Sequence, residues 1–298
     1  MFLRQNKLQV ELPQSPRPDA NAAAAMQELL GGRFGEMTAL NHYLFQSFNF
    51  RGKKKLKPFY DLVCCITAEK MGHVELASAA INMTLAGSSA PVDPGSAPLR
   101  EGLIKPDSYF FIGTGQTSLV SDSMGKAWSG DNVCSSGNLV LDLLQNFFLE
   151  SGARTQKMRV YEMTDHPTAR AMIGYLLVRG GAHVLANAKA LEIATGVDMK
   201  KLIPIPNLSN EHFETARKYE AMGLGNKLYT FSPSDYEDAA LIWCGQNPQT
   251  GAKLEMIQGA PEGASMPDLT ESQEAFAPGV SHDDFLEIAG RLKKNVGL

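Results

Sequence analysis

The segment FGEMTALNHYLF (residues 34–45) places one carboxylate, Glu36, inside a largely apolar stretch with a helical pattern. Three other stretches share this character: LLQNFFLESGA (143–153) with Glu150, YLLVRGGAHVLA (175–186) with His183, and ITAEKMGHVELA (66–77) with His73. Burying a carboxylate without a partner costs several kcal/mol, so such side chains require cations, hydrogen bonds or a water-filled pocket. One polar residue near the middle of each helix predicts that the four converge in the core of a bundle.

The pattern around these segments predicts four long helices joined by one long crossover. Asp19 or Asn21 is a suitable N-cap for the first, and Pro167 or Thr168 opens the last. Three glycines lie inside the first helix, which we interpret as a place where another backbone comes close. The crossover, 86–135, is rich in Gly, Ser, Pro and Asp. The expected fold is all-α, a ferritin-like four-helix bundle in a domain spanning 1–198, with helices at about 20–50, 58–85, 138–163 and 168–195.

The remaining residues, 199–298, are predicted to form an extended and mostly irregular C-terminal extension. Glycine and proline recur between positions 245 and 279, and few apolar residues follow a helical spacing there. The segment cannot build a core of its own, yet it contains apolar side chains such as Met256 and Phe276. We therefore expect it to pack on neighbouring subunits.

Composition excludes several classes of protein. The 298 residues carry 28 basic and 32 acidic side chains, a balance that argues against a nucleic-acid partner. No apolar run approaches the roughly 20 residues needed to cross a membrane. The start of the chain lacks the apolar core of a signal peptide. The four cysteines form no CxxC pair, so we expect a reduced, cytoplasmic protein without a membrane partner.

The four polar residues together predict a metal site. A single helical histidine is more often a hydrogen-bonded or surface residue than a ligand, and a single glutamate more often lies at an exposed helix edge. Glu36, His73, Glu150 and His183, one from each helix, instead favour a dinuclear site bridged by carboxylates. Such oxygen and imidazole donors suit manganese or non-haem iron better than zinc, and the spacing does not separate those two metals.

Two further polar residues share a helix face with the predicted ligands. Tyr43 follows Glu36 by seven residues and Lys157 follows Glu150 by seven, which is two helical turns. A phenol and an ammonium group directed into a metal pocket can orient ligands and transfer protons, which makes both residues candidate catalytic groups. A lysine on the helix surface explains the position of Lys157 equally well.

Three segments carry a family resemblance: GGRFGEMTALNHYLFQSFNFRGKKKLKP (31–58), GNLVLDLLQNFFLESGAR (137–154) and RVYEMTDHPTARAMIGYLLVRGGAH (159–183). They are similar to the non-haem manganese catalases, in particular to the branch from thermophilic bacteria. The resemblance implies a ferritin-like bundle, a core with two manganese ions, disproportionation of hydrogen peroxide to water and dioxygen, and a homohexamer. It also implies that Glu36 and His73 bind one manganese, that Glu150 and His183 bind the other, and that Tyr43 and Lys157 surround them.

One position departs from the family pattern. Where the resemblance implies a glutamate that bridges both metals, three residues before His73, this chain has Lys70. An ammonium group has three donors and no lone pair, so it cannot bind a metal unless it is deprotonated. Three outcomes stay open. Glu69 replaces the bridge, although it points about 100° away on an ideal helix. One metal is retained beside Lys70. Or Lys70 pairs with Glu36 and Glu150 in a pocket poor in metal or free of it.

The sequence thus predicts a manganese catalase, with Tyr43, Lys157 and Lys70 as the non-ligand residues of the site. An oxidative enzyme of different or weak activity on the same fold, and a metal-storage assembly without enzymatic activity, are the alternatives. Metal content measured together with oxygen evolution from peroxide separates the three.

Overall fold

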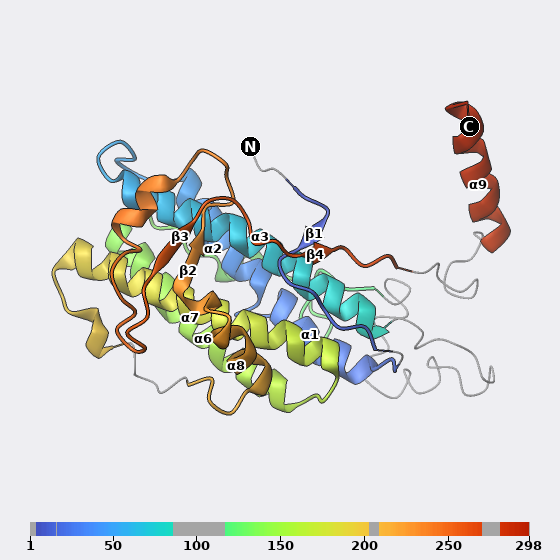
Figure 1. Cartoon of the computed structure of the whole chain (residues 1–298), viewed down its shortest axis with the longest axis horizontal. Coiled ribbons are helices and arrows are strands. Elements are labelled where there is room, and N and C mark those ends of the chain that lie inside the picture. The colour runs from blue at the N-terminus through green and yellow to red at the C-terminus, as the bar shows by residue number, and fades with distance from the viewer. Residues whose placement is uncertain (1–3, 16, 86–116, 203–208, 270–280, 298) are drawn as a thin grey trace.

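The computed structural model describes residues 4–15, 17–85, 117–202, 209–269 and 281–297. Long helices dominate it and lie side by side along the longest dimension of the molecule (Figure 1). The bundle consists of α2 (Glu36–Phe48), α3 (Lys57–Leu85), α6 (Leu139–Glu162) and α7 (Pro167–Thr195), with α1 (Ala20–Gly31) packed against α3. The predicted all-α, ferritin-like bundle is confirmed. Of the predicted crossover, 86–116 lie outside the described residues, and 117–135 are mostly irregular.

The prediction of one helix over 20–50 is wrong, because the chain forms two helices, α1 and α2. α1 ends at Gly31, and Gly35 is the N-cap of α2. Three glycines within five residues weaken a helix, so the break falls there. The predicted close approach is present, since a Cβ atom on Gly31 would lie 2.0 Å from the backbone oxygen of Ser121. The predicted cap is also present, because the carboxylate of Asp19 accepts a hydrogen bond from the amide of Ala22.

The other three helices begin and end within one residue of their predicted positions. Asn138 is the N-cap of α6, and its side chain accepts a hydrogen bond from the amide of Leu141. Pro167 is the first residue of α7, where its missing N–H leaves no hydrogen bond unmade. Gly196 ends α7 in the left-handed conformation at φ 74°, which glycine adopts without a steric penalty. Local sequence therefore determines these boundaries.

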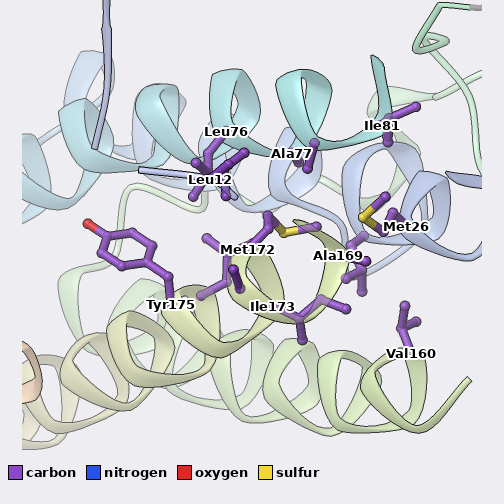
Figure 2. Packing of buried hydrophobic residues seen from close by; sticks show 14 of the residues in the cluster. Leu12, Met26, Leu76, Ala77, Ile81, Val160, Ala169, Met172, Ile173 and Tyr175 are labelled. Atoms are coloured by element: carbon purple, nitrogen blue, oxygen red, sulfur yellow. The ribbon is translucent and has the colours of Figure 1, made fainter. Parts of the chain in front are cut away.

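Two clusters of buried apolar side chains fill the bundle. In the first, Leu76 of α3 and Met172 of α7 lie in the same core region (Figure 2). The second includes Ile66 of α3 and Leu185 of α7, farther along the same two helices. Between the clusters, α3 carries the charged stretch that includes Glu69, Lys70 and His73. The polar residues predicted from sequence therefore lie in a layer with apolar packing on both sides.

Part of the C-terminal extension covers the bundle of its own chain. Strand β2 (Lys227–Tyr229) pairs in parallel with β3 (Glu255–Ile257), and β1 (Lys7–Leu8) pairs antiparallel with β4 (Ala264–Ser265). Trp243 is buried in the second apolar cluster. The remaining described elements of this region are η3 (Met199–Lys201), α8 (Glu214–Ala221), η4 (Leu224–Asn226), η5 (Glu237–Leu241) and α9 (His282–Asn295); η2 (Gly130–Asn132) precedes α6. The extension is mostly irregular, as predicted.

Helix α9 differs from the rest of the extension. It lies apart from the bundle in Figure 1, and none of its residues is buried. Its apolar side chains, including Phe285 and Leu292, are exposed. Packing of the extension on neighbouring subunits stays a prediction. In the part of the chain that the structure describes, no helix has the length and apolar character needed to cross a bilayer.

Candidate functional site

Four helices contribute charged side chains to the polar layer. Glu36 is the first residue of α2, and Glu150 lies in the middle of α6. α3 supplies His73 and α7 supplies His183. None of these four residues exposes more than 1% of its surface. The structure thus brings together all four residues that the sequence singled out as metal ligands.

The two histidines connect three carboxylates. Nδ1 of His73 lies 3.2 Å from Oε2 of Glu36, and its Nε2 lies 3.4 Å from Oε1 of Glu69. Nε2 of His183 lies 3.2 Å from Oε2 of Glu69, and its Nδ1 lies 3.4 Å from Oε1 of Glu150. The two imidazole rings are stacked, with their centroids 5.6 Å apart. Glu69 therefore lies between both histidines.

Lys70 closes this chain of contacts. Its Nζ lies 3.0 Å from Oε2 of Glu150 and 3.1 Å from Oε2 of Glu36. Lys70 is buried completely. Three carboxylates and three nitrogen-containing side chains thus alternate around a closed circuit, which we call the ring. In order, its members are Glu36, His73, Glu69, His183, Glu150 and Lys70.

Each carboxylate of the ring has one further polar partner outside it. Lys157 Nζ lies 2.6 Å from Oε1 of Glu36. Arg179 donates two hydrogen bonds to Glu69, at 2.5 and 2.9 Å. The hydroxyl of Tyr43 donates to Oε1 of Glu150 at 3.1 Å. Two of these three partners, Tyr43 and Lys157, are residues that the sequence predicted to surround the ligands. The third partner is Arg179. Lys157 is 1% exposed, which rules out the reading of a surface lysine.

Charges within the ring shift the pKa values of its members. Burial alone would raise the pKa of Glu150, but the positive charges of Lys70 and His183 lower it to about 2. Burial likewise opposes the net shift at Glu36, where Lys157 and Lys70 hold the pKa well below its usual range. Burial would lower the pKa of Lys70, but Glu150 and Glu36 raise it. These directions keep the carboxylates ionised and Lys70 protonated at neutral pH.

The shift at Glu150 predicts acid sensitivity. A pKa lowered from 4.5 to about 2 means that the unfolded chain takes up a proton in this window while the native chain does not. The stabilisation is complete above 4.5, and about 3 kcal/mol of it is lost as the pH falls to about 2. Urea unfolding across this range, in a chelating buffer, is expected to show a smaller loss for Glu150→Gln. Equal pH dependence in the two proteins would contradict the prediction.

Sequence reasoning missed Arg179 and Asn187. Arg179 lies four residues before His183 and Asn187 lies four residues after it, so all three share one face of α7. Nδ2 of Asn187 donates to the hydroxyl of Tyr43 at 2.9 Å, which orients that group toward Glu150. An arginine inside the apolar run YLLVRGGAH was the available signal, because a buried guanidinium requires a carboxylate partner.

A cavity of about 150 Å³ lies farther along the bundle from the ring. Gln46 lines the cavity and exchanges two hydrogen bonds with Asn146, at 2.7 and 3.0 Å. These residues lie one turn from Tyr43 and Glu150, respectively, on α2 and α6. Along both helices, the amide pair therefore lies between the ring and the far end of the cavity lining, Phe50 on the α2 side and Leu139 on α6. The other lining residues are Phe50, Arg51, Leu56, Val63, Gly137, Leu139, Asp142 and Leu143.

Comparisons with known proteins agree with this geometry. A family model described as manganese containing catalase matches residues 1–298. The chain belongs to the manganese catalase family. Among curated relatives, a manganese catalase of Bacillus subtilis is 31% identical over 261 residues, which cover 85% of this chain and 89% of the relative. A manganese catalase of Lactiplantibacillus plantarum is 36% identical over 199 residues, covering 64% and 71%.

A solved structure of the same family shares the fold. The crystal structure of KatB, a manganese catalase from Anabaena, has a TM-score of 0.55 to this chain. The match covers 65% of this chain and 81% of KatB at 22% sequence identity. At that identity the likeness supports the bundle and not the chemistry of the site.

The ring matches manganese in its kinds of donor atom but not in its arrangement. Nε2 of His73 and both ring nitrogens of His183 have no hydrogen-bond partner among the described residues. Buried imidazole nitrogens beside carboxylates are suitable manganese donors. However, no three histidine, cysteine, aspartate or glutamate side chains in the described ranges are arranged to hold a metal ion. Because Lys70 contacts oxygens of both Glu36 and Glu150, the ring does not fit a pair of manganese ions.

Proposed function

We propose that this member of the manganese catalase family disproportionates hydrogen peroxide to water and dioxygen, and that the ring is the site. The observation that carries the proposal is the convergence of Glu36, His73, Glu150 and His183, from four helices, in one buried layer. Membership of the family supports the same reaction.

The manganese assignment extends this proposal. As the family resemblance implies, Glu36 and His73 would serve one manganese and Glu150 and His183 the other, in chains in which a metal ion displaces Lys70 from the two carboxylates. The contacts between these side chains support that division, since each histidine lies within 3.4 Å of its assigned glutamate. Position 70 corresponds to the bridging glutamate of the thermophilic branch in this proposal. Tyr43 would hold the orientation of Glu150, and Lys157 that of Glu36, through the contacts described above.

The contacts of Lys70 favour a second candidate, a catalase-fold protein whose pocket is poor in metal or free of it. Lys70 supplies the positive charge between Glu36 and Glu150 that a metal ion would otherwise provide. Such a protein would have weak or different oxidative activity. A metal-storage assembly is distinguished from both candidates because it would contain manganese without turning over peroxide.

The test is oxygen evolution measured together with manganese content in several preparations of the native protein. We expect oxygen evolution to increase with bound manganese, and both to be lost in His73→Gln. His212→Gln is the matched control, because His212 is exposed and distant from the ring in sequence. Preparations that contain manganese but evolve no oxygen would contradict the proposed reaction and favour storage.

We also propose that the protein acts in the cytoplasm as a homohexamer with its C-terminal extension on neighbouring subunits. The exposed apolar residues of α9, among them Phe285, Leu286 and Ile288, support a partner for that helix. The helix carries a complete capping box at Ser281 and Asp284, which stabilises its first turn. A monomeric mass in sedimentation at micromolar concentration would contradict this assembly.

A further inference from the structure

The place of Lys70 within the ring is unusual for a lysine. Its ammonium group contacts one oxygen of Glu36 and one of Glu150, and neither glutamate is more than 1% exposed. The residue has no contact with bulk solvent, because it is fully buried. A lysine is seldom buried unless it is paired. Here the two carboxylates supply that pairing.

The charges around the ring balance. Its three carboxylates face three cationic groups in direct contact, one within the ring and two outside it. The three carboxylates and these three cationic groups sum to zero, and the cluster gains one positive charge when His183, which lies between Glu69 and Glu150, is protonated. An uncompensated buried charge is strongly destabilising, whereas a paired one is tolerated. The cationic groups are Lys70, Lys157 and Arg179.

A divalent ion would disturb this balance. It would add two positive charges beside the existing three, and it would need carboxylate oxygens that Lys70 already contacts. Lys70 also repels any cation that approaches the same oxygens. Replacement of Lys70 by methionine removes one positive charge from the cluster. Replacement by glutamate also adds one negative charge, so the net charge becomes more negative by two.

We infer that Lys70 is the resident cation of the ring, so that the native chain folds without a metal ion and manganese can enter only in competition with this ammonium group. The inference rests on the proposed function in taking the ring as the site. It deepens that function by assigning control of metal loading to one residue of this chain.

The experiment compares full-length native protein with Lys70→Glu and Lys70→Met after identical expression with added manganese. We expect the native protein to contain well below one manganese per chain, and its melting temperature to be unchanged by EDTA. Lys70→Glu is expected to bind at least one manganese per chain and to melt at a lower temperature after chelation, because bound metal stabilises the folded state. Lys70→Met is expected to lie between them in metal content.

Lys54→Glu is the matched control. It makes the same change of charge at an exposed position in the loop before α3, so its metal content should equal that of the native protein. If Lys70→Glu does not fold, the native protein still decides the matter. A native chain with one manganese or more, and a melting temperature that EDTA lowers, overturns the inference. A folded Lys70→Glu that binds no more manganese than the native chain also overturns it.

Failure of the inference is distinguishable from failure of the proposed function. Metal content and chelator sensitivity test Lys70 whatever the activity of the samples. A Lys70→Glu protein that binds manganese but evolves no oxygen contradicts the proposed reaction and supports the role of Lys70. Oxygen evolution that requires manganese in a native protein already fully loaded supports the reaction and overturns the role of Lys70.

Discussion

Replacing Arg179 with methionine is expected to lower the free energy of unfolding by about 3–5 kcal/mol, because it leaves the buried carboxylate of Glu69 without its strongest partner. The guanidinium group donates two hydrogen bonds to that carboxylate. It also donates to the backbone oxygens of Leu224 and Lys227, so the same substitution removes two hydrogen bonds between α7 and the segment that leads into β2. Urea denaturation measures the loss.

Arg291→Met is the control for this prediction. Arg291 is exposed and lies 3.5 Å from Glu287 on α9, an ion pair of a kind that contributes little. We expect its loss to change the free energy of unfolding by less than about 1 kcal/mol. If the two arginine variants were equally stable, the pairing of Arg179 with Glu69 would not be the source of stability that the geometry indicates.

Replacing Trp243 with alanine is expected to cost about 3–5 kcal/mol, the range for a large aromatic side chain lost from a core. Trp243 is 1% exposed, and its indole N–H donates to the backbone oxygens of Asn226 and Glu255 at 3.2 Å each. It thereby joins the irregular extension to the second apolar cluster. Leu241→Ala, two residues away and 67% exposed, should have little effect. A similar loss of stability in both variants would mean that the extension is not anchored through Trp243.

The helices of the bundle could be predicted because their signals are local. Asp19, Asn138 and Pro167 fix helix starts through hydrogen bonds and backbone geometry within a few residues. The break between α1 and α2 was not predicted because the close approach of another backbone was given more weight than the tendency of the three glycines to weaken a helix. Gly31 has both roles: it allows the backbone of Ser121 to come close, and it is the residue at which α1 ends.

The ring could be predicted only in part. Convergence of Glu36, His73, Glu150 and His183 follows from one polar residue in each helix. From the sequence, Glu69 was expected to point away from the position of Lys70, because consecutive residues on a helix differ in direction by about 100°. The layer is wide enough for both, because Glu69 approaches the histidines while Lys70 approaches the other two carboxylates. Which cation pairs with which carboxylate depends on helix packing that sequence spacing does not give.

The docking of the C-terminal extension on its own bundle could not be predicted for a related reason. Leu228 and Leu254 belong to the second apolar cluster together with residues of α3 and α7. Their contacts join segments that are far apart in the chain, and no local periodicity marks them. Composition correctly indicated a mostly irregular segment that needs a surface to cover, but not that part of this surface belongs to the same chain.

The alternation of acid and base around the ring also fixes the axial register of the helices. α2 and α6 each contribute one member, α7 contributes one, and α3 contributes three. A shift of α6 by one residue in register would move Glu150 about 1.5 Å along the axis and rotate it by about 100° around the axis. Glu150 would then point away from both Lys70 and His183. Apolar side chains tolerate such a slip more readily than ion pairs do, because their attraction is not directional. The ring therefore selects one alignment of four helices whose apolar faces alone would permit several.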